Sequence, residues 1–512
     1  MLPRSSVAVL LALAAPLTAH AQAPALTRAA GSITEADVRR RISIISDDSM
    51  GGRNTPSPGL AKTARYIASE FKRLGLKPAG DEGGYLMRYP IQQRKLLLSS
   101  SFVSLSGADG RAVKLMFGRD AAIASRGLPG GEGRGSLVLL GGAGRFDSLP
   151  KAELRDKFIV FTTDWSRVDA SVRLRALARV AADAGARGII AVVNSDSAFA
   201  SRYGAGSTQN WEVVGEPGSF YQVVVRESAI TAQAPEAAEQ FALLRAAPRV
   251  VVQAAPNFEG IVSLRDTTVS EQFAPNVVGI LEGSDPVLKN EYLVYSAHMD
   301  HLGTAGQPGS ACRATGADSV CNGADDDASG TAGVLELAEA YTARGARPKR
   351  SVIVLTVSGE EHGLWGSEWF VNHPPVPLPK IVADLNADMI GRNWPDTIVA
   401  IGKEHSDLGA TLNRVNTAHP ELKMNAIDDR WPEQRFYERS DHYNFAKKGV
   451  PILFFFNGTH PQYHRPDDAV DKIDAEKEAR IVRLLFFVGQ DVANAAKRPE
   501  WAPMSYKSIV TP

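Results

Sequence analysis

Histidine and acidic side chains recur directly after short apolar runs in the second half of the chain. The segments that contain them are YSAHMDHLG with His298 and Asp300, VSGEEHGLWGSE with Glu360 and Glu361, LNADMIGR with Asp388, and YHRPDDAVDKID with His464. A single acidic residue after a strand is usually a helix cap or a solvated turn. Several such segments together are harder to explain in that way, because open α/β sheets place their sites beyond the carboxyl ends of the strands. We therefore expect these side chains to form one polar site.

The side chains in these segments are of the kind that binds zinc. Imidazole and carboxylate ligands suit this ion, and the two cysteines of the chain lack the spacing of a zinc finger. Two histidines and three carboxylates are too many for one open tetrahedral site, but they fit two ions that share a bridging carboxylate. Such ions, ~3.5–4 Å apart, can activate a water and polarise a substrate carbonyl. A spare glutamate beside them can act as a general base.

The elements that must position these residues are short, apolar and rich in β-branched residues. From residue 275 onward, strands are predicted by NVVGILEG, YLVYSAH, SVIVLTVSG, KIVADLNAD, TIVAIG and VPILFFFNG, and helical patterns separate several of them. A final helix is predicted by AEKEARIVRLLFFVGQDVANAAK. Near-continuous apolar strands covered by helices indicate an α/β fold, with a mainly parallel mixed sheet sandwiched by helices.

The first half of the chain divides into two regions. Residues 33–80 are predicted to be helical, with Thr34 and Asp37 in a capping-box arrangement. The region 95–255 is richer in Gly, Ser and short strand-like runs, and within it KFIVFTTDW, VRLRALARVAADAGARG and IIAVVNSD predict strand, helix and strand. Composition alone leaves open whether this unit joins the main sheet or forms a separate domain.

The overall charge and the N-terminal segment limit the classes of protein to which this chain can belong. Lys plus Arg equals Asp plus Glu at 57 each, so no overall charge favours nucleic acid or acidic membranes. The start MLPRSSVAVLLALAAPLTAHAQA predicts a signal peptide at 1–21, because its apolar run is too short to span a bilayer and a small-x-small cleavage site follows. We expect an exported protein with no membrane segment in its mature form. Cys312 and Cys321 are then predicted to form a disulfide, with two free thiols as the alternative.

The order of the motifs resembles that of the co-catalytic di-zinc exopeptidases of the aminopeptidase Y and bacterial leucyl aminopeptidase family. The matching motifs are HxD, DD-small-SG, GEE, NxDMxG and a late YHxxxD, and the likeness covers 275–475. The resemblance implies that His298 and Asp388 hold one zinc, Glu361 and His464 the other, that Asp326 bridges them, that Glu360 is the general base, that Asp300 orients His298, and that Tyr437 donates to the oxyanion. Four other histidines near the motifs do not match ligand positions and are expected to line or support the pocket: His301, His362, His442 and His460.

The bridging role implied for Asp326 bears on the segment NGADDDASG at 322–330, where three aspartates stand in a row. Like charges this close repel, so a positive group or solvent should offset them. Asp327 or Ser329 could cap the following helix, and Asp325 could add negative potential.

The middle region resembles a protease-associated domain through RDKFIVFTT followed by AADAGARGIIAVVN. The resemblance thus implies a peptidase domain in two parts, 22–95 and 256–512, around a smaller β-rich insertion at 96–255.

The expected function is that of an exported aminopeptidase that uses two zinc ions per chain to release N-terminal residues from peptides. One alternative is a carboxypeptidase of the glutamate carboxypeptidase type, in which nearby arginines would bind a terminal carboxylate; the candidates are Arg392, Arg435, Arg439 and Arg465. Another is a non-catalytic binding protein like the transferrin receptor, a relative of the family. Neither the preferred substrate side chain nor the oligomeric state has a readable pattern in the sequence.

Overall fold

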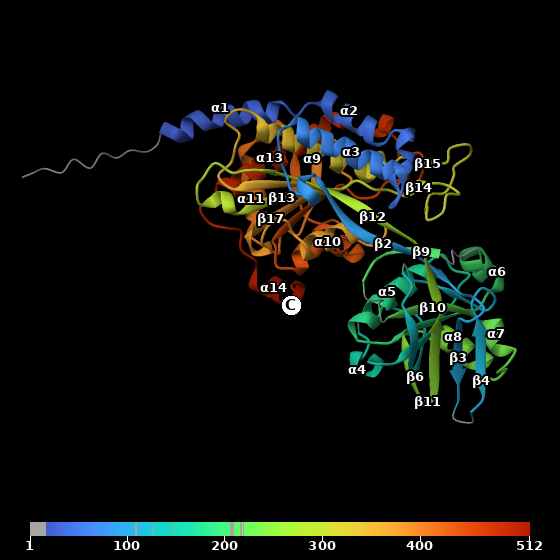
Figure 1. Cartoon of the computed structure of the whole chain (residues 1–512). Coiled ribbons are helices and arrows are strands. Elements are labelled where there is room, and N and C mark those ends of the chain that lie inside the picture. The colour runs from blue at the N-terminus through green and yellow to red at the C-terminus, as the bar shows by residue number, and fades with distance from the viewer. Residues whose placement is uncertain are drawn as a thin grey trace, which may run out of the picture. The chain divides into compact units, whose positions relative to one another are not determined.

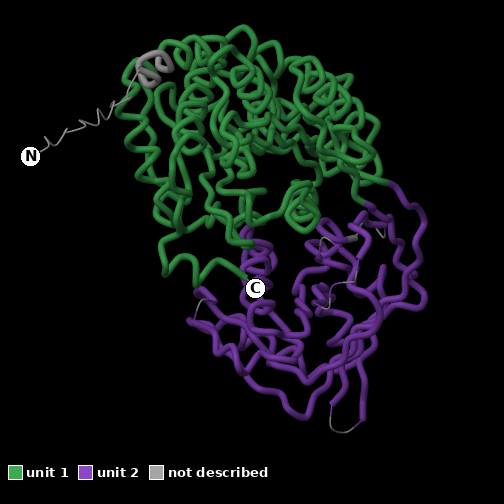
Figure 2. Tube along the Cα trace, turned by 60° about the vertical axis from the view of Figure 1, so that its left-hand side comes forward, with its two compact units in different colours: residues 1–89, 273–512 green, residues 90–272 purple. Residues whose placement is uncertain are grey.

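The computed structural model describes residues 17–107, 110–125, 127–146, 148–204, 209–215, 218 and 220–511 (Figure 1). The chain divides into two compact units, one of residues 1–89 and 273–512 and the other of residues 90–272 (Figure 2). It passes between them along two long strands, β2 (Leu86–Leu96) and β12 (Asp266–Leu281).

The predicted signal peptide at 1–21 falls largely outside the described residues. Helix α1 (Leu17–Gly31) covers the predicted cleavage site, so cleavage stays a prediction. Among the described residues, no helix has the length and apolar character needed to cross a membrane.

Unit 1 is built on a sheet whose central strands are parallel. In the order β20-β17-β13-β16, the strands β20 (Ile452–Phe456), β17 (Ile381–Ala387), β13 (Tyr292–His298) and β16 (Ser351–Val357) all run in the same direction. On one side β12 pairs antiparallel with β16, and on the other β18 (Thr397–Ile401) pairs antiparallel with β20 and parallel with β19 (Asn425–Ile427). The predicted strands are confirmed, and the sheet is mixed, with its continuous parallel block in the middle.

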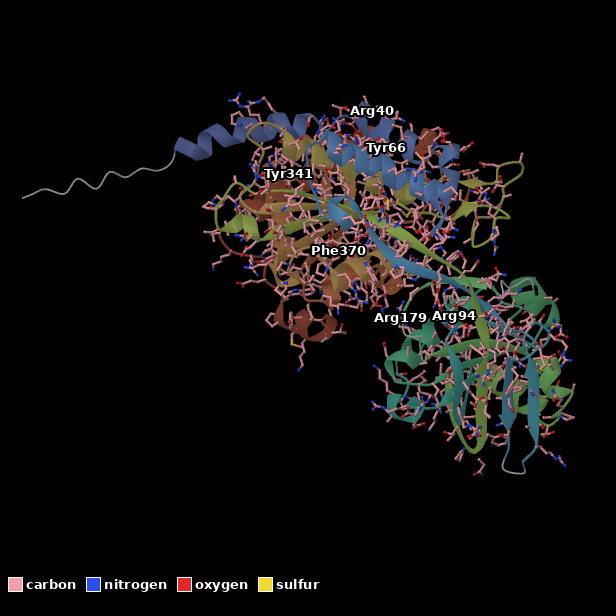
Figure 3. The ribbon with its side chains drawn as sticks, viewed as in Figure 1. Arg40, Tyr66, Arg94, Arg179, Tyr341 and Phe370 are labelled. Atoms are coloured by element: carbon pink, nitrogen blue, oxygen red, sulfur yellow. A yellow bond between two sulfur atoms is a disulfide. The ribbon has the colours of Figure 1, made fainter. Side chains whose placement is uncertain are left out.

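The central strands are buried on both faces because helices cover each side. Alternate side chains enter different cores, as Val354 and Leu355 of β16 illustrate. One core lies under α2 (Glu35–Ile45), α3 (Pro58–Arg73), α9 (Gly330–Thr342), α11 (Leu408–Ala418) and the predicted final helix α13 (Ala475–Asn494). The other lies under α10 (Trp365–Asn372) and α12 (His442–Lys447). Figure 3 labels Tyr341 of the first core and Phe370 of the second.

Side-chain caps explain where several of these helices begin. Thr34 accepts a hydrogen bond from the Asp37 backbone N–H (3.1 Å), as the capping-box arrangement predicts. Its hydroxyl also donates to the Asp37 carboxylate (2.7 Å). Ser57 caps α3 and Asp474 caps α13 through equivalent contacts.

Unit 2 has its own eight-stranded sheet, in the order β4-β3-β11-β6-β7-β8-β10-β5. The strands β6 (Gly131–Gly141), β7 (Phe158–Thr163), β8 (Gly188–Val193) and β10 (Tyr221–Arg226) are parallel, and the flanking β3 (Phe102–Ser106), β4 (Ala112–Met116), β5 (Ala121–Ile123) and β11 (Val251–Leu264) are antiparallel to their neighbours. The predicted strand, helix and strand are β7, α5 (Ala170–Asp183) and β8, so they belong to this second sheet. The region predicted as an insertion, 96–255, lies inside unit 2, which covers residues 90–272. On the C-terminal side the β11 ladder continues to Leu264.

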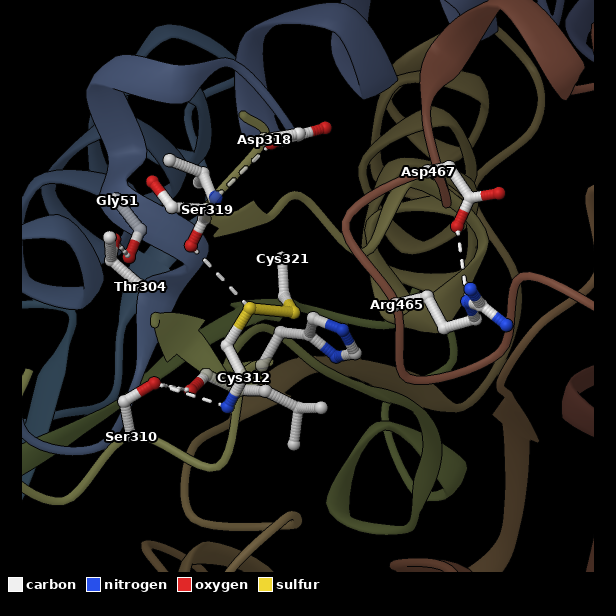
Figure 4. Close-up of a disulfide and its surroundings, with 12 residues drawn as sticks. Gly51, Thr304, Ser310, Cys312, Asp318, Ser319, Cys321, Arg465 and Asp467 are labelled. Atoms are coloured by element: carbon white, nitrogen blue, oxygen red, sulfur yellow. Dashed lines mark hydrogen bonds and ion pairs between the residues drawn. A yellow bond between two sulfur atoms is a disulfide. The ribbon is translucent and has the colours of Figure 1, made fainter. Parts of the chain in front are cut away.

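The predicted disulfide is present in the structure. Figure 4 shows the bond between Cys312 and Cys321, which joins the loop between the short paired strands β14 (Gly303–Thr304) and β15 (Val320–Cys321) to the last residue of β15. The Cys312 backbone N–H donates to the Ser310 hydroxyl at 3.1 Å.

Candidate metal centre

The predicted site residues stand at the carboxyl ends of the parallel strands of unit 1. His298 is the last residue of β13, Asp388 follows β17 directly, and Glu360 and Glu361 lie in the turn after β16. His464 lies in the segment between β20 and α13. Because parallel strands end at the same edge, this topology gathers side chains that are far apart in sequence.

Asp326 lies in the π-helical turn Ala324–Ser329, which leads into α9. Gly323 precedes this turn with φ of +56°, and a Cβ there would lie 2.1 Å from the Asp326 carbonyl oxygen. Only glycine allows this close approach, which brings the Asp326 carboxylate to the sheet edge.

The two oxygens of Asp326 face two different histidines. Its Oδ1 is 3.3 Å from His298 Nε2, and its Oδ2 is 3.2 Å from His464 Nε2. His298 Nε2 is also 3.6 Å from Asp388 Oδ1, so His298, Asp326 and Asp388 form one group of potential metal ligands. The Asp326 carboxylate is therefore placed to be shared between two ions.

The second group contains one more histidine than the sequence predicted. Glu361 Oε2 is 3.5 Å from His464 Nε2, and Glu361 Oε1 is 2.9 Å from His301 Nδ1. His301 Nδ1 is also 3.8 Å from Asp326 Oδ2, which places His301 with Asp326 and Glu361 as potential ligands. We expected His301 only to line or support the pocket, but its ring faces the carboxylates directly.

The donor set fits divalent zinc. Carboxylates and imidazoles from five segments converge in a largely buried cluster, where excess negative charge is costly without a cation. Both His301 ring nitrogens and Glu361 Oε1 are buried, and the 2.9 Å approach of Nδ1 to Oε1 does not have the geometry of a hydrogen bond. Burial opposes charge on His298, but Asp388 and Asp327 outweigh it and raise the pKa of His298 well above its usual value. Burial likewise disfavours ionised Asp326, but the surrounding histidines hold its pKa well below the usual range.

Asp300 contacts His298 and two further segments of the site. The contact of His298 Nδ1 at 3.2 Å is with the Asp300 backbone oxygen, while the nearest carboxylate oxygen is 3.8 Å away. The carboxylate accepts hydrogen bonds from the Thr55 hydroxyl (2.9 Å) and from the Glu360 backbone N–H (3.2 Å). Asp300 therefore connects the end of β13 to the turn that carries Glu360.

The other two aspartates of the acidic segment hold backbone in place. Asp327 accepts hydrogen bonds from the backbone N–H groups of His298 (3.2 Å), Gly330 (2.8 Å) and Met389 (3.1 Å). It thus caps the start of α9 and joins it to β13 and to the segment after β17. Asp325 is buried and accepts from the Gly391 N–H at 2.7 Å, so it is a structural contact rather than added surface potential.

Arg53 places a buried positive charge beside the acidic segment, where Asp326 and Asp327 favour its charged form. Its side chain is fully buried and donates to backbone carbonyls of the segment after β13 and of the acidic segment before α9. The acceptors are the carbonyl oxygens of Met299 (2.9 Å), Ile45 (3.0 Å), Asn322 (2.5 Å), Gly323 (3.0 Å) and Asp326 (3.5 Å). This role could not be predicted, because an isolated arginine between glycines and asparagine has no periodic pattern.

Glu360 lines a pocket beside the two groups of potential ligands. The residues lining it are His298, Asp326, Glu360, Asp388, Met389, Phe436, Arg439, Ser440, Phe454, Phe456, Tyr463 and His464. Burial raises the pKa of Glu360 well above the usual glutamate value, and the charge of His298 opposes that rise while Glu361 adds to it.

Tyr437, for which the resemblance implies the oxyanion role, is not among the residues that line this pocket. Its ring packs against His405 (4.5 Å between centroids) and His442 (5.6 Å), and its hydroxyl is buried without a hydrogen bond. Tyr463 lines the pocket instead and stacks on the ring of His464 at 3.8 Å. The YH pair in the late motif could have indicated Tyr463, because a side chain next to a predicted ligand in sequence lies close to the same site.

The remaining histidines support the surroundings of the site, as expected. His362 is 3.0 Å from Asn54 Oδ1, and His442 Nε2 is 2.8 Å from the Tyr437 backbone oxygen. His460 Nε2 is 3.3 Å from the carboxylate of Asp325.

Comparison with known proteins identifies relatives of the segment that carries this site. Residues 276–488 match Peptidase family M28. A "Probable leucine aminopeptidase" of Trichophyton verrucosum (strain HKI 0517) is 27% identical over 236 residues, which is 43% of this chain and 58% of that protein. The "Leupeptin-inactivating enzyme 1" of Streptomyces exfoliatus is 32% identical over 197 residues, which is 38% of this chain and 39% of that protein. The matches thus span less than two thirds of either relative.

A solved structure shares the fold. The "Aminopeptidase from Aneurinibacillus sp. strain AM-1" aligns with a TM-score of 0.51 and 18% identity, covering 92% of this chain and 96% of that one. The resemblance predicted from the motifs is confirmed by the family match and by the names of these relatives.

Proposed function

From the match of residues 276–488 to Peptidase family M28, we infer that this chain is a zinc-dependent aminopeptidase that removes N-terminal residues from peptides. The observation that carries the proposal is the carboxylate of Asp326, which faces His298 with one oxygen and His464 with the other. Asp388 completes the first group and Glu361 the second, so each of two zinc ions would have an imidazole and a carboxylate besides the shared Asp326. Zinc held there supplies Lewis acidity toward the scissile carbonyl and the attacking water.

Glu360 is the general base in this proposal. It lines the pocket beside both groups, and its backbone N–H is held by Asp300. Its carboxylate takes a proton from the attacking water and returns that proton to the leaving amine, which completes the cleavage of the peptide bond.

Tyr463 takes the role that the sequence assigned to Tyr437. Its hydroxyl donates a hydrogen bond to the oxygen of the scissile carbonyl as that oxygen gains negative charge. The contact with His464 keeps the phenol ring beside the second group of ligands.

The pocket also contains surfaces suited to the two features of a peptide N-terminus. Met389, Phe436, Phe454 and Phe456 offer an apolar wall for the first side chain. The carboxylates of Glu360 and Asp388 offer acceptors for a free α-amine. The curated relative named as a leucine aminopeptidase agrees with an apolar first residue.

Export and the inserted unit remain part of the proposal. The predicted signal at 1–21 and the disulfide between Cys312 and Cys321 are both typical of exported proteins. Unit 2 is proposed to be a protease-associated domain on the sequence pattern of β7, α5 and β8.

Zinc removal tests this function. The purified chain is expected to hold about two zinc ions, and a chelator should abolish hydrolysis that zinc then restores. A peptide with a free N-terminus should be cleaved, while its N-acetylated counterpart should not. Hydrolysis that survives complete zinc removal, or equal cleavage of the acetylated peptide, would contradict the assignment.

A further inference from the structure

Arg439 stands out among the residues of the pocket because of its charge. It is the only lysine or arginine among the described residues that line the pocket, where carboxylates and aromatic rings predominate. Its side chain is exposed rather than buried in the fold, so its guanidinium is available to a bound molecule.

The other arginines near the site are already engaged with protein groups. Arg435 donates to Glu438 (3.1 Å), Arg392 donates to the Gln462 side chain (2.9 Å), and Arg465 Nε is 3.6 Å from Asp467. The carboxylates of Glu438 and Asp467 offset part of the charge of Arg435 and Arg465, and Arg392 Nη1 lies 3.9 Å from the Asp468 carboxylate.

Arg439 has a different environment. Its guanidinium lies over the face of the Phe436 ring, 4.5 Å from the centroid. Within the part of the chain that the structure describes, no carboxylate lies within ion-pair distance of it. The aromatic face fixes the orientation of the guanidinium and leaves its N–H donors free, an arrangement that suits bidentate binding of a carboxylate.

We propose that Arg439 binds a carboxylate on the residue that follows the scissile bond, so that the enzyme favours short peptides with a free C-terminus. The inference rests on the proposed aminopeptidase function. With the N-terminus at Glu360 and Asp388, a dipeptide spans only about 7 Å, because each extended residue covers ~3.3–3.6 Å. Its terminal carboxylate therefore lies within the same pocket, on whose lining Arg439 stands.

A glutamate or aspartate side chain at that residue would present the same chemistry. Three substrates separate the sources: leucyl-leucine with a terminal carboxylate, leucyl-glutamate α-amide with only a side-chain carboxylate, and leucyl-leucine amide with neither. All three have the same first residue, so differences among them report the second residue alone.

The test compares the wild-type chain with Arg439→Gln and Arg439→Lys, and uses Arg435→Gln as the matched control on the same segment. We expect Arg439→Gln to lower kcat/KM about tenfold or more for a carboxylate-bearing substrate, mainly through KM, because a charge-assisted hydrogen bond is lost. Leucyl-leucine amide should change less than about threefold, Arg439→Lys should retain part of the preference, and Arg435→Gln should change none of the three. Zinc content and thermal stability should stay as in the wild type.

The outcomes separate this inference from the function on which it rests. A loss confined to leucyl-leucine supports recognition of the C-terminus, and one confined to leucyl-glutamate α-amide supports recognition of an acidic side chain. Equal losses for all three substrates would overturn the role of Arg439 while leaving the aminopeptidase assignment intact. A zinc-loaded wild-type chain that cleaves none of them would overturn the proposed function itself.

Discussion

The two units each contain a block of four parallel strands, but only one of these blocks carries a candidate site among the described residues. In unit 1 the block β20-β17-β13-β16 ends in histidines and carboxylates that face one another. In unit 2 the block β6-β7-β8-β10 has the same internal direction, and polar residues also follow its strands. Both groups of potential metal ligands found in the described part of the chain lie in unit 1.

The difference lies in the partners of the polar side chains. In unit 2, Asp164 after β7 accepts hydrogen bonds from Ser166, Asn194 after β8 accepts from the Trp165 backbone N–H, and Glu227 after β10 pairs with Arg245. These contacts satisfy the groups locally. In unit 1, buried atoms of His301 and Glu361 have no hydrogen bond. The carboxyl edge of a parallel sheet is therefore not a functional site by itself. What distinguishes the edge in unit 1 is that some of its buried acidic and imidazole groups lack hydrogen-bond partners in the protein.

The largest effect should come from Glu360→Gln. The substitution keeps the shape of the side chain but removes the proposed general base, so kcat should fall by about 10²–10⁴. Zinc content should stay near that of the wild type, because Glu360 lies outside both groups of potential ligands. Metal analysis and a release assay on the same preparation check the prediction. A variant that keeps most of its activity would show that another group moves the proton.

A pair of tyrosine variants should lower kcat by less. They compare a tyrosine that lines the pocket with one that does not. Tyr463→Phe removes a hydroxyl from the pocket, and kcat should fall about 10–10³-fold if that hydroxyl stabilises the oxyanion. Tyr437→Phe removes a hydroxyl that is buried among His405 and His442, so it is the matched control. Its kcat should change less than about threefold, since it donates no hydrogen bond in the structure. A larger loss in Tyr437→Phe than in Tyr463→Phe would restore the original sequence assignment.

The sequence predicted the strands and most candidate ligands because both are local patterns. Apolar β-branched runs locate β13, β16, β17 and β20, and the residue types just after them locate the edge. Strand direction is not local: the runs of β12 and β18 resemble the central strands, yet both pair antiparallel with the parallel block. Similarly, the C-terminal end of unit 2 could not be predicted from composition, because β11 stays paired with β6 as far as Leu264, beyond the predicted boundary at 255.

The direction of side chains in loops is the other feature that could not be predicted from the sequence. Tyr437 and Tyr463 both lie near motif residues, and only the backbone decides which one faces the pocket. His464 has φ of +60°, a local conformation that spacing in the sequence does not reveal. His301 and Arg53 were missed as contributors for a related reason. Each acts through contacts with segments distant in sequence, and a single sequence contains no record of such contacts.

The smallest effect should come from Asp164→Ala in unit 2, at a strand end that resembles those of unit 1 in position only. The Ser166 hydroxyl and backbone N–H donate to Asp164 and hold the pKa of its carboxyl below the usual range. A lowered pKa means that the contact stabilises the fold above the usual aspartate pKa and that this contribution disappears as the pH falls through the lowered value. At neutral pH the substitution should therefore cost about 1 kcal/mol or less, and at an acidic pH below the lowered value the difference from wild type should vanish. Peptidase activity and zinc content should not change. Hydrogen exchange of β7 at both pH values measures the local stability, and a large loss of hydrolysis in this variant would mean that the strand ends of unit 2 also serve the reaction.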